Sequence, residues 1–116
     1  MDDRLKITLL LDFYGGLLTK KQFEMLDLHY NNDYSLAEVA SEYNITRQGA
    51  FDNIKRGKAS LFELEDKLKL VEKFTSQKRK AKLVLEYMQQ LDTSRLDEES
   101  MKYLDKIKEE ITGLLE

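Results

Sequence analysis

With 116 residues, 41% of them hydrophobic and 35% charged, the chain is long enough to bury a core beneath a heavily solvated surface. It contains no cysteine, which excludes disulfides and thiolate metal sites, and its single histidine excludes a metal site built on two histidines. The lack of proline and a total of five glycines favour long helices, and the net charge of −3 excludes a polycation.

The first helix is predicted over residues 4–14, because apolar residues recur there at helical spacing. Its expected inward face consists of Leu5, Leu9, Leu10 and Phe13. Gly15 and Gly16 should end this helix, because two residues without a Cβ favour a bend over helix continuation. A short turn is therefore expected before the next helix.

A second helix is predicted after Thr19, which stands three residues before Gln22 in the pattern of a capping box. The residues expected to be buried on it are Phe23, Leu26 and Tyr30. His29 is expected to be a structural residue rather than a ligand. The polar run at 31–33 should end the helix, since Asn and Asp side chains compete for backbone hydrogen bonds.

Two capped helices are predicted next. Ser35 and Glu38 form a second capping-box pattern at the start of a short helix, which residues 44–45 should end after two turns. Thr46 then caps a longer helix that continues at least to Leu61. The residues expected to be buried are Leu36, Val39, Ala40 and Tyr43 on the short helix, and Ala50, Ile54, Gly57 and Leu61 on the long one. A short bracing helix, a turn and a longer presented helix make a helix-turn-helix.

Beyond Leu61 the apolar residues alternate spacings of three and four, as in heptads. The three runs are Leu61, Leu64, Leu68 and Val71; Ala81, Val84, Met88 and Leu91; and Leu104, Ile107, Ile111 and Leu114. Breaks are expected near residues 75–76 and 92–94, the latter as a cap for the last helix. We expect residues 1–61 to form a helix-turn-helix domain and residues 62–116 a helical extension, whose seams close within one chain or between two copies.

Several stretches of the sequence carry a family resemblance. Residues 35–40, SLAEVA, followed by residues 44–48, NITRQ, are similar to the helix-turn-helix of sigma factor region 4. Residues 10–19, LLDFYGGLLT, and 45–56, ITRQGAFDNIKR, resemble the bacterial YlxM family, and the likeness covers essentially the whole chain. The resemblance implies an all-α DNA-binding regulator with a sigma-region-4-like helix-turn-helix and a genetic link to the signal recognition particle pathway.

The predicted reading surface lies on the longer helix and at its approaches. The candidate DNA-binding residues are Ser35, Thr46, Arg47, Gln48, Phe51, Asp52, Lys55, Arg56 and Lys58. Arginine and lysine pair with phosphates or guanine edges, and glutamine can address adenine. Asp52 repels phosphates unless it accepts a cytosine amino group or pairs with Arg56.

A second basic patch is expected at Lys78, Arg79, Lys80 and Lys82. It contacts phosphates of DNA or RNA in one interpretation. In the other interpretation it is a solvated helix face or pairs with the acidic C-terminal segment.

No constellation of side chains indicates catalysis, so we expect a cytoplasmic protein that is not an enzyme and uses no cofactor, metal or membrane. One hypothesis is a DNA-binding regulator that dimerises through its C-terminal helices. The other is an adaptor that binds a protein or RNA component of the signal recognition particle. Two basic islands, each of net charge +3 over residues 46–60 and 76–91, support the first hypothesis. Asp52 and the acidic balance of the whole chain support the second.

Overall fold

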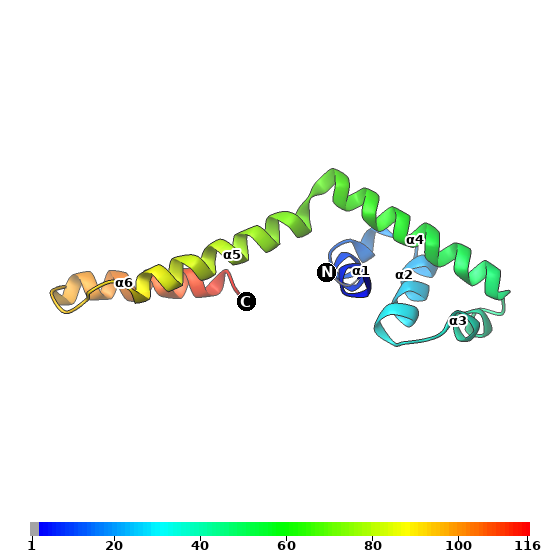
Figure 1. The fold of residues 1–116 in the computed structure, drawn as a ribbon, viewed down its shortest axis with the longest axis horizontal. Coiled ribbons are helices and arrows are strands. Elements are labelled where there is room, and N and C mark those ends of the chain that lie inside the picture. Colours follow the sequence, from blue (N-terminus) through cyan, green and yellow to red (C-terminus); the bar gives the residue numbers. More distant parts are fainter. Residues whose placement is uncertain (1–2) are drawn as a thin grey trace. The chain divides into compact units, whose positions relative to one another are not determined.

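The structure, a computed structural model, describes residues 3–116, and Met1 and Asp2 lie outside the described range. Its helices are α1 (Asp3–Tyr14), α2 (Lys20–Leu26), α3 (Leu36–Glu42), α4 (Arg47–Leu68), α5 (Leu70–Gln89) and α6 (Glu98–Gly113) (Figure 1). Residues 3–116 contain no strand, which confirms the prediction of an all-α fold. The chain divides into two compact units, one ending at Val71 and the other comprising Glu72–Glu116. None of the described helices is both long and apolar enough to cross a membrane.

Helix α1 has the predicted bounds within one residue, but it buries a different face. The buried side chains are Ile7, Leu10, Leu11 and Tyr14. Leu5 is 61% exposed, so its predicted burial was wrong, and Leu9 and Phe13 are only half-buried. The helix carries apolar residues on more than one side, and packing against α4 and the π-helical turn Asp27–Asn31 decides which side becomes the core.

The predicted turn and cap after α1 are both confirmed. Gly15–Leu17 form a single 3-10 turn, and the hydroxyl of Thr19 accepts a hydrogen bond from Gln22 N–H at 3.2 Å. A Cβ on Gly15 would lie 2.7 Å from the Phe23 ring, so the absence of a side chain lets the ring cover the turn. Phe23 therefore stays 37% exposed, contrary to prediction, and Met25 joins Leu26 in the core.

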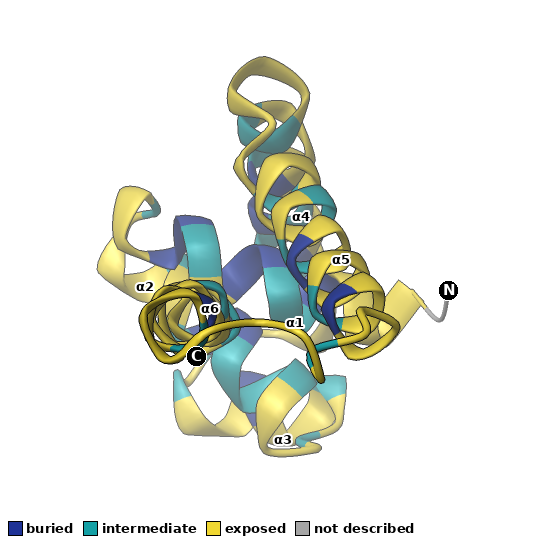
Figure 2. Cartoon of the chain, turned by 90° about the vertical axis from the view of Figure 1, so that its left-hand side faces the viewer, coloured by how far each residue is buried: buried dark blue, intermediate teal, exposed yellow. Residues whose placement is uncertain are grey.

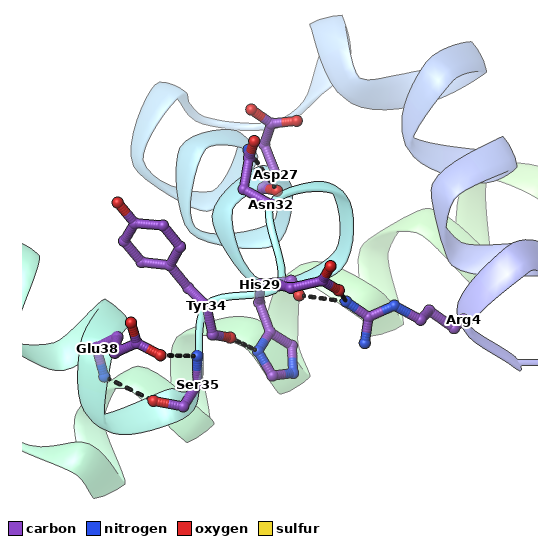
Figure 3. Close-up of polar contacts among 8 residues, drawn as sticks. Arg4, Asp27, His29, Asn32, Tyr34, Ser35 and Glu38 are labelled. Carbon is purple, nitrogen blue, oxygen red and sulfur yellow. Dashed lines mark hydrogen bonds and ion pairs between the residues drawn. The ribbon is translucent and has the colours of Figure 1, made fainter.

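A π-helical turn, Asp27–Asn31, continues α2 and is tied to α1 (Figure 3). Arg4 donates a hydrogen bond to the carbonyl of His29 at 2.9 Å and forms an ion pair with Asp33, a residue with positive φ of 58°. His29 Nδ1 donates to the carbonyl of Tyr34 at 2.7 Å, so His29 is structural, as predicted. These bonds fix the backbone immediately before α3.

Helix α4 packs against α1, α2 and α3 and organises the first unit (Figure 1). Its buried residues are Ala50, Ile54, Gly57 and Leu61, which confirms the predicted stripe in full. At Gly57 the backbone approaches α2 so closely that a Cβ would lie 2.8 Å from Leu26 Cδ1. Leu26 is itself fully buried, so the two helices approach closely at this point of the core.

The junction between α4 and α5 was predicted in the wrong place. The helix ends at Leu68, because Lys69 adopts a left-handed conformation with φ of 57°, and α5 then continues through Thr75 and Ser76, where the break was expected. The end of α4 at this point could not be predicted from the sequence, because lysine rarely adopts a positive φ.

Tyr14 and Glu65 stabilise this junction. Tyr14 Oη donates to Glu65 Oε1 at 2.5 Å and accepts from Leu70 N–H at 3.0 Å, while Glu65 Oε1 also accepts from Val71 N–H at 3.0 Å. Two of the free amides at the start of α5 are thereby satisfied. Burial, and then the hydrogen bond to Glu65, raise the pKa of Tyr14, which keeps its hydroxyl protonated and able to donate.

The second unit is a helical hairpin in which α6 runs antiparallel alongside α5 (Figure 1). Ala81, Met88 and Leu104 are its buried residues, and most of both helices is exposed (Figure 2). The last helix was expected to start at residues 92–94, but α6 begins at Glu98, where Asp97 accepts from Ser100 N–H at 2.7 Å. Asp92 instead closes a local turn with the backbone N–H and hydroxyl of Ser94.

Candidate nucleic-acid interface

Helices α3 and α4 form the helix-turn-helix that the sequence predicted. Ser35 and Glu38 make a reciprocal capping box at 3.0 and 3.1 Å, visible in Figure 3, and α3 buries Val39 and Ala40 against the core. Asn44 takes a left-handed conformation with φ of 54° and turns the chain toward α4. Ile45 N–H then bonds the carbonyl of Ala40 at 2.9 Å, which closes the turn.

A side-chain hydrogen bond also connects the C-terminal end of α3 to α2. Tyr43 Oη donates to Glu24 Oε2 of α2 at 2.6 Å. Burial, followed by the hydrogen bond to Glu24, raises the pKa of Tyr43 to about 12, so the donor proton stays in place throughout the neutral range. The short helix is therefore held to the core by polar as well as apolar contacts.

The start of α4 is capped by Thr46. Its hydroxyl accepts from Gly49 N–H at 3.0 Å. The amides at the first two helical positions, Arg47 and Gln48, have no acceptor within the helix, because the first turn of any α-helix leaves such donors. These donors, with the positive end of the helix dipole, suit a phosphate.

Removing this cap should weaken the presented helix. Thr46→Ala is expected to lower the free energy of unfolding by about 1 kcal/mol, the usual effect of deleting an N-cap oxygen. Thr46→Ser keeps the oxygen and serves as the matched control, with a change well below that of alanine. Urea unfolding followed by circular dichroism measures both. Equal losses for the two variants would contradict the cap's contribution.

The candidate DNA-binding residues divide by exposure. Those exposed to solvent are Ser35, Thr46, Arg47, Gln48, Phe51, Asp52, Lys55 and Arg56. Lys58 is half-buried, and its ammonium lies 5.9 Å from the centre of the Tyr30 ring, within reach of a cation–π contact. Phe51 is 44% exposed, so a large apolar ring stands beside the cationic side chains.

Asp52 interacts with Gln48 rather than with an arginine. Gln48 Nε2 donates to Asp52 Oδ1 at 3.1 Å across one turn of α4. Within residues 3–116, Arg47, Lys55 and Arg56 form no ion pair with a carboxylate, so the alternative pairing of Asp52 with Arg56 is not realised. Three cations of the reading surface are thus left for an external anion.

The second basic island does not form a single surface. Lys78 is half-buried and lies 4.6 Å from the centre of the Phe74 ring. Arg79, Lys80 and Lys82 are exposed on α5, but residues one or two apart on a helix point about 100° or 200° away from each other. They cannot all face one phosphate backbone at once.

Two cation–π contacts near the reading surface were not predicted from the sequence. Lys6 of α1 lies 5.3 Å from the centre of the Phe62 ring of α4, and Arg4 lies 5.8 Å from that of Tyr30. Both pairs join helices far apart in the chain, so no local spacing could have predicted them. They bring two further cations toward the flank of α4 that carries Lys58.

Comparisons with known proteins agree with this geometry. Residues 1–106 match the UPF0122 family model, described as "Putative helix-turn-helix protein, YlxM / p13 like". A UPF0122 protein of Acetivibrio thermocellus is 51% identical over 116 residues, covering 100% of this chain and 99% of its own length. One from Clostridium perfringens is 43% identical over 112 residues, covering 96% and 97% of the two chains. One from Halalkalibacterium halodurans is 37% identical over 107 residues, covering 92% and 95%.

Proposed function

Because the chain belongs to the UPF0122 family of YlxM / p13-like helix-turn-helix proteins, we propose that it is a regulatory protein that binds duplex DNA through α4. The observation that carries the proposal is the solvent face of α4. There Arg47 stands in the first turn, beside the open helix N-terminus, and Lys55 and Arg56 project from the third turn, all without carboxylate partners among the described residues. Cations arranged in this way on a presented helix are typical of a DNA-reading surface.

The proposed docking follows the helix-turn-helix geometry. Helix α4 enters the major groove by its N-terminal turns, where Arg56 and Lys55 reach phosphates or guanine edges. The free amides after Thr46 bind a phosphate at the groove's rim. Gln48 is oriented by Asp52, so the pair presents a fixed arrangement of donor and acceptor to the base edges.

The reading helix carries a net charge of only +3 over residues 46–60, so a single copy binds DNA weakly and the proposal includes a homodimer. Two linked heads raise the effective affinity without any new contact to DNA. The helical extension is the natural place for self-association, because Glu72–Glu116 form a compact unit of their own.

An adaptor for a protein or RNA component of the signal recognition particle is the second candidate function. Two observations favour it: the carboxylate of Asp52 stands in the middle of the reading surface, and Phe51 is exposed next to it. A protein-docking surface tolerates a carboxylate and uses an aromatic anchor. Such an adaptor would depend on Phe51 more than on Arg56.

A titration of random duplex DNA across a salt series separates the two functions, with the RNA of the signal recognition particle in parallel. Duplex binding by the regulator should weaken steeply with salt. Arg56→Ala should weaken it about tenfold and reduce the salt slope by about one, whereas Lys21→Ala, which removes a charge from α2, should leave it nearly unchanged. No duplex binding, together with capture of the RNA and loss on Phe51→Ala, would replace the regulator by the adaptor.

A further inference from the structure

The hairpin of α5 and α6 leaves large apolar side chains uncovered. Tyr87 and Tyr103 are 67% and 58% exposed. The other members of this set are Val84, Leu91, Ile107 and Leu114, each more than a third exposed. By contrast, only Ala81, Met88 and Leu104 are buried between the two helices. Monomeric proteins rarely leave so much contiguous apolar surface in water.

The four of these side chains that belong to the helices themselves lie on one face of the hairpin. On α5, Val84 follows the buried Ala81 by three residues and Tyr87 precedes the buried Met88 by one. On α6, Ile107 follows the buried Leu104 by three and Tyr103 precedes it by one. Both steps rotate the side chain by about 60° to 100° in the same sense. Because the helices are antiparallel, equal rotations from the shared seam bring both stripes to the same side (Figure 1).

Charge distinguishes the two halves of this face. Helix α5 contains five basic and two acidic residues, and α6 contains three basic and five acidic residues. Lys80 precedes Ala81 and Glu110 precedes the half-buried Ile111, so each lies on its own apolar stripe. The two residues also lie at similar distances from the loop that joins the helices. The face is therefore positive along α5 and negative along α6.

We propose that this face binds a second copy of the chain, with α5 of each copy lying on α6 of the other around a two-fold axis parallel to the helices. This specifies the homodimer contained in the proposed function. The arrangement sets Lys80 against Glu110 of the second copy, and it does so twice because the contact is symmetric. Placing α5 on α5 would instead oppose like charges.

The resulting assembly is a four-helix bundle. Its centre is the apolar face, to which each hairpin contributes the exposed side chains Val84, Tyr87, Tyr103 and Ile107. A stable dimer removes about 800 Å² of surface from each partner, which two helices of this length can supply. In this dimer Lys80 lies at the interface, whereas Arg79 and Lys82 remain on the polar side of α5, opposite the interface.

Charge reversal and sedimentation equilibrium of the full chain, without nucleic acid, test the inference. Lys80→Glu and Glu110→Lys should each weaken dimerisation about tenfold, and the double variant should regain most of the loss. The matched controls Lys102→Glu and Glu109→Lys make the same charge changes on the polar side and should leave dimerisation unchanged. Ile107→Asp should give a monomer that remains helical by circular dichroism.

Two results would overturn the inference: a wild-type monomer at about 100 μM, or a double reversal that is weaker than both single ones. Either result would leave DNA binding by α4 as a separate question, because no DNA is present in the measurement. Conversely, a dimer with the expected reversal pattern would stand even if the chain bound no duplex.

Discussion

Leu26→Ala is expected to lower the free energy of unfolding by about 3 kcal/mol, the middle of the range for a leucine deleted from a tightly packed core. The Leu26 side chain is fully buried, and its Cδ1 and Cγ fill the space above Gly57. Alanine would leave a cavity there, because α4 and α2 are fixed by their other contacts. Such a loss is a large share of the stability of a small helical unit. Urea unfolding monitored by circular dichroism measures it.

The control for this experiment is Leu17→Ala. Leu17 is 66% exposed in the turn after α1, so the same chemical deletion should change the stability by about 0.5 kcal/mol or less. If both leucine deletions had similar effects, the core would not be centred where α2 meets α4.

Gly57→Val is expected to destabilise the first unit by about 2 kcal/mol or more. Any Cβ at this position meets Leu26 Cδ1 at 2.8 Å, and valine adds two further methyl groups next to this fully buried side chain. The gain in helix propensity over glycine amounts to only a few tenths of a kcal/mol, so overpacking dominates. Thermal or urea unfolding of the variant gives the size of the effect.

Two comparisons show whether the clash with Leu26 is the cause. Ala59→Val, two residues along the same helix at an exposed position, should change the stability by about 0.5 kcal/mol or less. Gly57→Val introduced into the Leu26→Ala variant should be far less harmful than in the wild type, because the colliding side chain is gone. Additive losses in the double variant would assign the effect of Gly57→Val to the backbone instead.

Helix starts and the buried side of α4 could be predicted from the sequence, because short-range patterns determine them. The caps at Thr19, Ser35 and Thr46 were correct, because a side-chain oxygen at the right spacing satisfies amides that nothing else nearby can reach. The buried stripe of α4, Ala50 to Leu61, was also correct. These residues fall within one narrow sector of the helix, and the exposed Phe51 lies outside it, so helical periodicity alone identified the buried side.

Predictions failed where distant parts of the chain decide the outcome. Helix α1 has two apolar sides, and its neighbours bury the one with Ile7 rather than the one with Leu5. The end of α4 at Lys69 is stabilised by Tyr14 of α1. Its hydroxyl, distant in the sequence, accepts a hydrogen bond from Leu70 N–H. No local pattern contains information about such a partner.

The candidate site was predictable in its positions but not in its pairing. The reading surface faces solvent at the residues that helical periodicity indicated, apart from the half-buried Lys58. The sequence allowed Asp52 to pair with Arg56, whereas the structure pairs it with Gln48. Both partners lie one turn away along the helix, so spacing alone could not separate them. Side-chain geometry makes that distinction.

The hydrogen bonds of the Tyr14 hydroxyl and the Glu65 carboxylate determine how much of the chain is needed to express the helix-turn-helix unit by itself. The Tyr14 hydroxyl accepts a hydrogen bond from Leu70 N–H, and the Glu65 carboxylate accepts one from Val71 N–H. A truncation that stops at the end of α4 would remove both N–H donors. The half-buried Glu65 carboxylate and the Tyr14 hydroxyl beside it would then each lack a hydrogen bond that they have in the whole chain. The shortest fragment that retains the native end of α4 therefore includes Leu70 and Val71. The first residues of α5 thus belong structurally to the helix-turn-helix unit.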